Sequence, residues 1–216
     1  MSKAKKRTAL VTGASSGIGK SIATRLAADG FEVILVSRTA SSLEKVLEEI
    51  KAAGGTGRVM VCDVSNQKAV NAMMEQVESL DVLVNNAGRS GGGHTVQMDD
   101  QLWHDIIATN LNSVYYLTKA ALAQNKINKP GSIISIASTG GKQGIIYGAA
   151  YSASKHGIVG YSKSLGLELA KDNTPSMPFA QVLSKLLWRV VPDKCIVRSG
   201  ILHLKMPRRV SNKEFQ

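Results

Sequence analysis

Short apolar runs alternate along this chain with longer segments in which apolar residues recur every three or four positions. The runs typical of buried strands are Thr8–Val11, Glu32–Ser37, Arg58–Cys62, Val82–Asn85 and Ser132–Ile136. Helical spacing is seen for Ile22, Ala23, Leu26 and Ala27, for Leu43, Val46, Leu47 and Ile50, for Val70, Met73, Met74 and Val77, and throughout Leu102–Asn125 and Tyr151–Lys171. The pattern therefore predicts strands and helices that alternate.

This alternation predicts the fold class. Each strand–helix–strand unit joins parallel neighbours through a right-handed crossover, so the sequence favours an α/β fold with a doubly wound parallel sheet, a Rossmann-type three-layer sandwich. We expect residues 1–172 to form this domain. In such sheets ligands bind beyond the C-terminal strand ends, at the point where the strand order reverses. Polar residues that follow the predicted strands are therefore candidates for a shared site.

A glycine-rich turn, Thr12–Gly19, links the first predicted strand to the first predicted helix. Glycine allows a tight turn and a close approach of the backbone to a pyrophosphate, and the following helix N-terminus presents free N–H groups to phosphate. The spacing is G-x-x-x-G-x-G instead of the commoner G-x-G-x-x-G, and a plain tight loop is the alternative. Because the turn lies between strand and helix, we predict dinucleotide binding by Gly13, Ser15, Ser16, Gly17, Ile18 and Gly19.

The ends of the second and third strands indicate which dinucleotide binds. An enzyme that selects NAD usually has Asp or Glu after its second strand to hold the ribose 2′-hydroxyl, whereas this chain has Arg38. A guanidinium suits a 2′-phosphate, so we predict NADP(H), with a solvated loop arginine as the alternative. Asp63 and Val64 follow the third strand and are predicted to meet the adenine, although Asp63 could instead cap the next helix.

Composition narrows the class of protein. The length of 216 residues suits one domain, and the only two cysteines, Cys62 and Cys195, are far apart, which favours reduced thiols and a cytoplasmic location. No apolar run is long enough for a membrane span or a signal-peptide core, so we expect no membrane association. The net charge is +11, yet no recognition motif gathers it. We therefore expect no nucleic-acid partner, and we assign no metal ligands.

Four further motifs complete the pattern of a known family. Asn85–Gly88 follows the fourth strand, Asn110 lies in a long helix, Ser138 follows the fifth strand, and Tyr151–Lys155 reads Y-S-A-S-K. Together with the glycine turn they resemble the short-chain dehydrogenase/reductase family over about residues 7 to 172. The resemblance implies that the cofactor is also contacted by Asn86, Ala87, Gly88, Tyr151 and Lys155.

The predicted chemistry centres on Tyr151 and Lys155, whose spacing of four places both on one helix face. A tyrosine hydroxyl alone is a weak acid near neutral pH, and a lysine cation beside it stabilises its phenolate. Tyr151 can then protonate a substrate carbonyl oxygen that Ser138 also hydrogen-bonds, while the cofactor supplies hydride. No histidine is placed to activate Ser138, which argues against a serine hydrolase. The resemblance implies that Lys155 holds the nicotinamide ribose and that Asn110 anchors a water in the proton relay.

A narrower likeness concerns the substrate. Gly88–Gly93 and Ser138–Gly144 are similar to segments of the ketoreductases of aromatic (type II) polyketide synthases, which usually have proline where this chain has Ser90. The likeness implies reduction of a β-keto group on a chain held by an acyl carrier protein, which basic residues would attract. It also implies a homo-oligomer, with substrate contacts by Ser90, Gly91, Gly92 and Gln143. The alternatives are a 3-oxoacyl-carrier-protein reductase of fatty-acid synthesis and a non-catalytic dinucleotide-binding protein.

The last fifth of the chain departs from the family. Residues 1–170 carry 18 Lys and Arg against 13 Asp and Glu, whereas residues 171–216 carry 9 against 3. After Lys171 the family would supply a sixth strand, an Asn-Ala-x-x-Pro-Gly turn, a threonine near the nicotinamide carboxamide and a substrate lid. None of these is recognisable, so we expect the sheet edge, the threonine and the lid to be lacking, and residues 173–216 to form no domain.

A shifted reading frame accounts for this departure. Back-translating residues 175–189 and reading one base earlier forces Ala at Met177–Pro178 and allows only Cys or Arg at Phe179–Ala180. One consistent reading is AVNAICPGFIETPMA, which contains the missing turn and threonine in order. A divergent tail that permits this reading by chance is the alternative. We therefore predict a frameshift near Asp172–Thr174, with weak NADPH binding and an inactive or aggregating product as its consequence.

Overall fold

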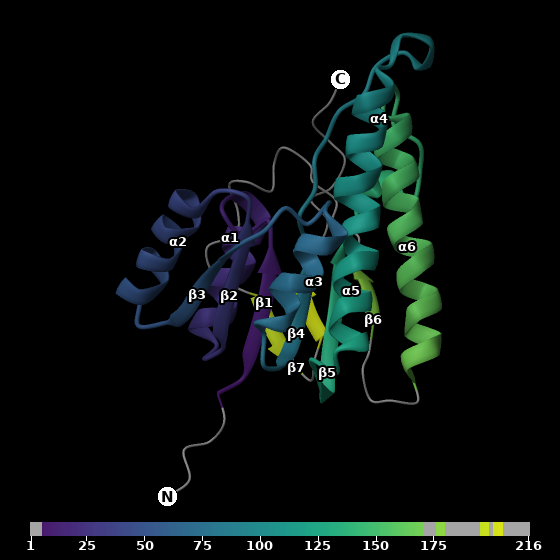
Figure 1. The fold of residues 1–216 in the computed structure, drawn as a ribbon. Helices are drawn as coiled ribbons and strands as arrows, with labels where there is room; N and C mark the ends of the chain where they lie inside the picture. The colour runs from purple at the N-terminus through teal and green to yellow at the C-terminus, as the bar shows by residue number, and fades with distance from the viewer. Residues whose placement is uncertain (1–5, 171–175, 180–194, 199–200, 205–216) are drawn as a thin grey trace, which may run out of the picture. The chain divides into compact units, whose positions relative to one another are not determined.

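The computed structural model describes residues 6–170, 176–179, 195–198 and 201–204. It divides into two units, residues 1–182 and 183–216. The first holds the main sheet and its helices (Figure 1), and the second holds one antiparallel pair, β7 (Cys195–Arg198) and β8 (Ile201–Leu204). The predicted frameshift near Asp172–Thr174 lies outside the described residues, as does most of the atypical tail.

Strands and helices alternate along the first unit as the hydrophobic pattern predicts. The first five strands are β1 (Thr8–Thr12), β2 (Glu32–Ser37), β3 (Thr56–Val61), β4 (Leu80–Asn85) and β5 (Ile127–Ile136). The helices are α1 (Gly17–Ala28), α2 (Ala40–Ala52), α3 (Gln67–Glu75), α4 (Asp100–Ile107), α5 (Ser113–Ala123) and α6 (Ala149–Leu169). Two 3-10 turns, η1 (Thr95–Gln97) and η3 (Thr139–Gly141), lie in the loops.

Among the described residues, six strands form one parallel sheet in the order β3-β2-β1-β4-β5-β6. The sixth strand, β6 (Ser176–Phe179), pairs with the end of β5. Chain order reverses between β1 and β4, so the ligand crevice is expected beyond the C-terminal ends of these two strands. This topology confirms the doubly wound α/β fold.

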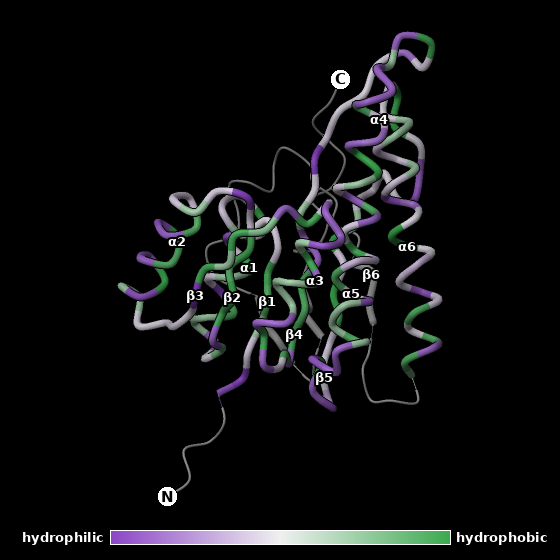
Figure 2. The backbone as a smooth tube through the Cα atoms, viewed as in Figure 1, coloured by the Kyte–Doolittle hydropathy of each residue, from purple (hydrophilic) through white to green (hydrophobic). Residues whose placement is uncertain are grey.

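Helices cover both faces of the sheet because successive strand residues point to opposite sides. Val11 and Leu35 pack in the cluster that α1 and α2 complete, whereas Leu10 and Ile34 pack with side chains of α3, α5 and α6. Figure 2 shows the central strands as largely hydrophobic and α2 as mixed, in keeping with one buried helix face. Burial of each large side chain stabilises the fold by about 1.5–3 kcal/mol. The two cores hold the strand ends rigid beneath the site.

The single helix predicted over Leu102–Asn125 is instead two helices joined by a π-helical turn, η2 (Ala108–Asn112). A π turn inserts one extra residue into a helix and occurs frequently at functional sites. Asn110 lies in this turn and is fully buried. Hydrophobic periodicity alone did not reveal the interruption, because a one-turn π segment barely changes which residues are buried.

The structure corrects one part of the prediction for the chain after Lys171, because a sixth strand is present. β6 pairs in parallel with β5 over four residues, from Ser176 opposite Ile133 to Phe179 opposite Ile136. This run carries no strand signal in the sequence, because it is short and contains Pro178, which cannot donate to a ladder. The described part of the sheet places β6 at its edge, where a strand can accommodate a missing N–H.

Candidate active site

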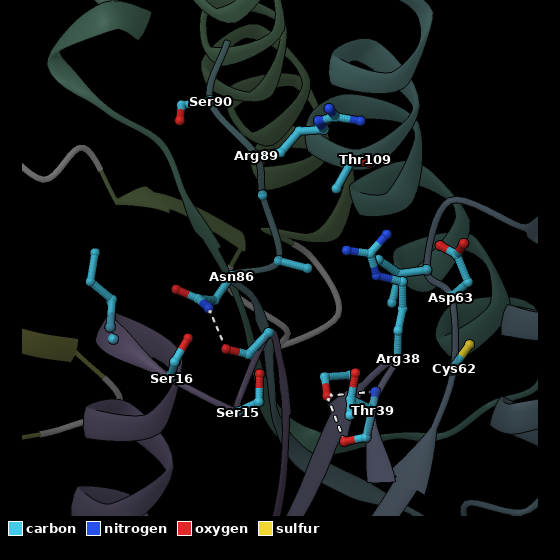
Figure 3. Close-up of a pocket in the computed structure, with 18 residues that line it drawn as sticks. Ser15, Ser16, Arg38, Thr39, Cys62, Asp63, Asn86, Arg89, Ser90 and Thr109 are labelled. Carbon is cyan, nitrogen blue, oxygen red and sulfur yellow. Dashed lines mark hydrogen bonds between the residues drawn. The ribbon is translucent and has the colours of Figure 1, made fainter. Parts of the chain in front are cut away.

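A pocket of about 900 Å³ lies beyond the C-terminal ends of β1–β4, at the reversal of strand order. Its lining residues, several of which are labelled in Figure 3, come from five separate segments of the chain. The residues predicted to bind the cofactor that line this pocket are Gly13, Ser15, Ser16, Gly17, Ile18, Gly19, Arg38, Asp63, Val64, Asn86, Ala87 and Gly88. Tyr151 and Lys155 belong to the neighbouring group of predicted catalytic residues described below.

The β1–α1 turn forms a cradle for an anionic group. Gly13 has φ +64°, and a Cβ there would lie 2.9 Å from Nδ2 of Asn86 and 3.0 Å from Cα of Ala87. Ser16 precedes the first turn of α1, and its side chain makes no capping hydrogen bond. The N–H groups at this helix start therefore remain for a ligand, and the helix dipole favours phosphate there. The residues present fit a dinucleotide pyrophosphate.

Thr12 joins this turn to the end of β4. Its side chain is fully buried, and its hydroxyl accepts hydrogen bonds from the N–H groups of Asn86 and Ala87, both at 3.0 Å. The hydroxyl donates to the carbonyl oxygen of Val84 at 3.3 Å, and Nδ2 of Asn86 donates to the Thr12 carbonyl at 2.9 Å. These bonds fix the two loops on either side of the crevice with respect to each other.

The predicted adenosine end of the pocket is polar and carries Arg38. In Figure 3 Arg38 lies on the same side of the pocket as Cys62 and Asp63, and away from Ser16. Its chain neighbours at the end of β2, Ser37 and Thr39, carry hydroxyl groups and also line the pocket. Within the described structure, this stretch therefore presents no carboxylate to the pocket. Asp63 accepts hydrogen bonds from the N–H (3.0 Å) and hydroxyl (2.7 Å) of Ser65. It does not cap α3, which is capped by Asn66.

Asn110 is held by three hydrogen bonds in the π turn. Its Oδ1 accepts from the N–H of Arg89 at 2.8 Å, and its Nδ2 donates to the Arg89 carbonyl at 3.0 Å. Nδ2 also donates to Oγ of Ser154 on α6 at 3.0 Å. The carboxamide therefore connects the loop after β4, the π turn and α6, the helix that carries Tyr151 and Lys155.

Lys155 is buried among these groups. Its Nζ donates to the carbonyl oxygen of Ile136 at 2.8 Å and lies 5.8 Å from the centroid of the Tyr151 ring. Burial lowers the pKa of Lys155 to about 8, because a charged ammonium loses solvation there. A Cβ on Gly88 would lie 3.7 Å from this Nζ and 3.3 Å from Oδ1 of Asn110. The Asn110 carboxamide and the Lys155 ammonium thus converge at the end of β4.

Ser138 and Tyr151 meet across η3. Ser138 begins this turn, and its Oγ accepts a hydrogen bond from the N–H of Gly140 at 3.1 Å. A Cβ on Gly140 would lie 3.2 Å from Cε1 of Tyr151, so the tyrosine ring packs on the same turn. Both side chains are half-buried, which leaves part of each hydroxyl-bearing residue accessible. The structure brings all four predicted catalytic residues to one end of the sheet.

The residues predicted to contact substrate have different surroundings. Ser90 lines the pocket, and Gln143 is exposed. A Cβ on Gly92 would overlap the carbonyl oxygen of Tyr147, to which the next residue donates its N–H at 2.8 Å. A Cβ on Gly91 would press on Leu102 at 3.0 Å. These two glycines therefore allow the loop after β4 to pack closely, and their substrate contacts remain a prediction.

Five residues line the pocket that sequence reasoning did not assign to it: Ser37, Thr39, Cys62, Arg89 and Thr109. Each one is adjacent in the chain to a predicted site residue, and that adjacency was the available signal. Arg89 pairs with Asp105, whose carboxyl pKa is lowered first by a hydrogen bond from Gln101. Burial, and then the Asp63 carboxylate, raises the pKa of the Cys62 thiol.

Neither a membrane span nor a metal centre is found among the described residues. No helix in these ranges has both the length and the apolar character needed to cross a membrane. The same residues contain no group of three or more metal-ligating side chains that could hold an ion.

Comparison with known proteins gives consistent matches. The family described as short chain dehydrogenase matches residues 7–176. A protein assigned as ketoacyl reductase 1 of the granaticin polyketide synthase in Streptomyces violaceoruber is 48% identical over 174 residues, which are 78% of this chain and 64% of that protein. The 3-oxoacyl-[acyl-carrier-protein] reductase of Escherichia coli is 37% identical over 168 residues, 76% of this chain and 68% of the relative.

A solved structure extends the likeness to three dimensions. A point variant of the actinorhodin polyketide ketoreductase, solved with NADPH, is 42% identical, with a TM-score of 0.76 over 82% of this chain and 70% of that one. This chain spans slightly less than two thirds of the length of the granaticin relative.

Proposed function

This chain belongs to the short chain dehydrogenase family, and on that premise we propose that it is an NADPH-dependent reductase of a β-keto group, allied to the polyketide ketoreductases. The observation that carries the proposal is the convergence of Ser138, Tyr151, Lys155 and Asn110 beside a pocket suited to a dinucleotide. Ketoreductase relatives at 47–48% identity support a polyketide substrate over the fatty-acid alternative, whose relatives are 37–41% identical.

NADPH, when bound, would supply the hydride. The chain's own residues would bind and orient it: the N–H groups at the start of α1 would hold the pyrophosphate, and Arg38, which lines the pocket, would hold the 2′-phosphate. The relative whose structure was solved with NADPH supports this choice of cofactor. Asp63 and Val64 would contact the adenine, and Asn86, Ala87 and Gly88 would contact the nicotinamide half of the cofactor.

Side chains of this chain would carry out the proton transfer that accompanies hydride transfer. Ser138 would donate a hydrogen bond to the substrate carbonyl oxygen, and Tyr151 would transfer its hydroxyl proton to the same oxygen. The Lys155 ammonium would stabilise the resulting phenolate, since it lies 5.8 Å from the ring centroid. Asn110 would anchor the water through which Tyr151 regains a proton.

The substrate is proposed to be a ketone on a chain held by an acyl carrier protein, which the excess of Lys and Arg would attract. Ser90, Gly91, Gly92 and Gln143 are the proposed substrate contacts. We also propose that the protein is cytoplasmic and forms a homo-oligomer. The oligomer is supported by exposed apolar side chains on three neighbouring helices, namely Trp103, Tyr115 and Leu167.

The test follows NADPH oxidation by absorbance with trans-1-decalone, a bicyclic ketone surrogate. The chain with its reading frame restored after residue 172 is expected to turn over. In that chain Tyr151→Phe is expected to lose at least about 100-fold in kcat while binding NADPH normally, because only the proton donor is removed. Turnover by Tyr151→Phe would show that another acid operates.

A second substrate separates the alternatives. Acetoacetyl coenzyme A is a short acyclic β-keto thioester. Reduction of this compound without any reduction of the decalone would favour a fatty-acid reductase. Binding of NADPH without turnover of either ketone would favour a non-catalytic dinucleotide-binding protein.

A further inference from the structure

Ser154 is a fully buried serine between the two catalytic residues of α6, and the proposed chemistry does not use it. Its hydroxyl donates to the carbonyl oxygen of Tyr151 at 2.7 Å, one turn back along the helix. Because the hydroxyl proton is committed there, Ser154 can only accept from Asn110, and it does so from Nδ2 at 3.0 Å. The hydroxyl thus links the backbone of Tyr151 to the carboxamide of Asn110.

The link constrains which way the carboxamide faces. With Nδ2 turned toward Ser154, Oδ1 is turned toward the N–H of Arg89 and the space beside Gly88. A flipped amide would set two oxygens against each other at Ser154 and at the Arg89 carbonyl. Arg89 belongs to the loop after β4, whereas Ser154 belongs to α6. Of these hydrogen bonds, the one to Ser154 joins the carboxamide to the helix that carries Tyr151 and Lys155.

We propose that Ser154 is a positioning residue, which ties Asn110 to the catalytic helix and thereby sets the spacing between the Asn110 carboxamide, Tyr151 and Lys155. This inference rests on the proposed reductase function. Alanine at this position would leave a buried N–H of Asn110 unpaired and would remove the hydrogen bond that joins the Asn110 carboxamide to α6. The carboxamide would then be held by the loop after β4 alone.

A double-mutant cycle tests the link. Ser154→Ala, Asn110→Ala and the double variant are made in the chain with its reading frame restored, and each is compared with that parent chain for kcat, for the KM of NADPH and for the urea midpoint of unfolding. Ser154→Ala is expected to lower kcat by about 10- to 100-fold, a loss typical of catalytic groups moved out of place, with little change in the KM of NADPH. In the Asn110→Ala background the same substitution is expected to cause no further loss of kcat.

The matched control is Ser162→Ala, which removes another buried serine hydroxyl from the same helix, two turns farther on. It is expected to lower the urea midpoint without lowering kcat. Ser154→Cys replaces the hydroxyl oxygen with a somewhat larger sulfur that forms weaker hydrogen bonds, and its kcat is expected to fall between those of wild type and Ser154→Ala. It replaces the alanine variant in the cycle if that variant fails to fold.

The outcomes separate this inference from the proposed function. Additive losses of kcat, or an equal loss in Ser162→Ala, would overturn the positioning role, and so would a loss of NADPH binding in both Ser154 variants. A wild type that binds NADPH but reduces neither ketone refutes the proposed function instead. The link is then judged by the unfolding cycle alone, where additive shifts of the urea midpoint overturn it and non-additive shifts support it.

Discussion

Replacing Thr12 with valine removes one hydroxyl that serves three partners. The N–H groups of Asn86 and Ala87 lose an acceptor at 3.0 Å, and the Val84 carbonyl loses a donor at 3.3 Å. An unpaired buried donor costs about 1–3 kcal/mol, and these two N–H groups are partly buried, so the loss should be about 2–4 kcal/mol in total. Thr12→Val is therefore expected to be one of the more damaging substitutions of a single hydroxyl in this chain.

The same substitution should weaken cofactor binding. Asn86 and Ala87 line the pocket, and their backbone is positioned by Thr12. If about 1.4 kcal/mol of this loss reduces the free energy of NADPH binding, the Kd for NADPH rises about tenfold. Urea unfolding measures the free energy of unfolding, and the enhancement of NADPH fluorescence on binding measures the Kd.

Two controls isolate the hydroxyl. Thr12→Ser retains the hydroxyl and loses a methyl group, which should cost about 1 kcal/mol and leave the Kd for NADPH unchanged. Thr118→Val removes an equally buried hydroxyl that accepts from Nδ2 of Asn85 at 3.3 Å, on a helix that does not line the pocket. The reasoning is refuted if Thr12→Val loses less than about 1 kcal/mol, or weakens NADPH binding no more than Thr118→Val does.

Three further predictions concern the site and the tail. Burial lowers the pKa of Lys155 to about 8, below its ordinary value of 10.5, so kcat/KM for NADPH should fall as pH rises through about 8, when the ammonium is lost. Between about pH 8 and pH 10.5 the folded chain binds fewer protons at Lys155 than the unfolded chain does, so the free energy of unfolding should rise with pH. A kcat/KM that stays flat as pH rises through about 8 would contradict the role of the Lys155 ammonium. Arg38→Ala should raise the KM for NADPH at least about tenfold and leave that for NADH nearly unchanged, and equal effects on both cofactors would remove Arg38 from the 2′-phosphate site. Resequencing should reveal a single-base insertion or deletion near codons 172–174, and a chain with the frame restored should bind NADPH more tightly than the 216-residue chain; an unbroken frame would refute this.

Local patterns in the sequence determined the fold class and most of the site. Strand and helix periodicity depends on which residues are buried, so the bounds of β2 were predicted to the residue and those of the other early strands within one or two residues. Parallel strands share one carboxyl edge, and for that reason residues that follow different strands, such as Gly13, Arg38 and Asn86, could be expected in one pocket.

Features that depend on partners distant in the chain were decided by the tertiary structure. The π turn at Asn110 and the hydroxyl link of Ser154 join residues 44 positions apart, and Thr12 reaches Asn86 across 74. β6 forms because an edge position beside β5 accepts a short strand with Pro178, although the same four residues give no strand signal alone. Periodicity reports how much of a side chain is buried, whereas a hydrogen bond requires two particular atoms to meet in the right direction. Only the packed sheet and helices bring those atoms together.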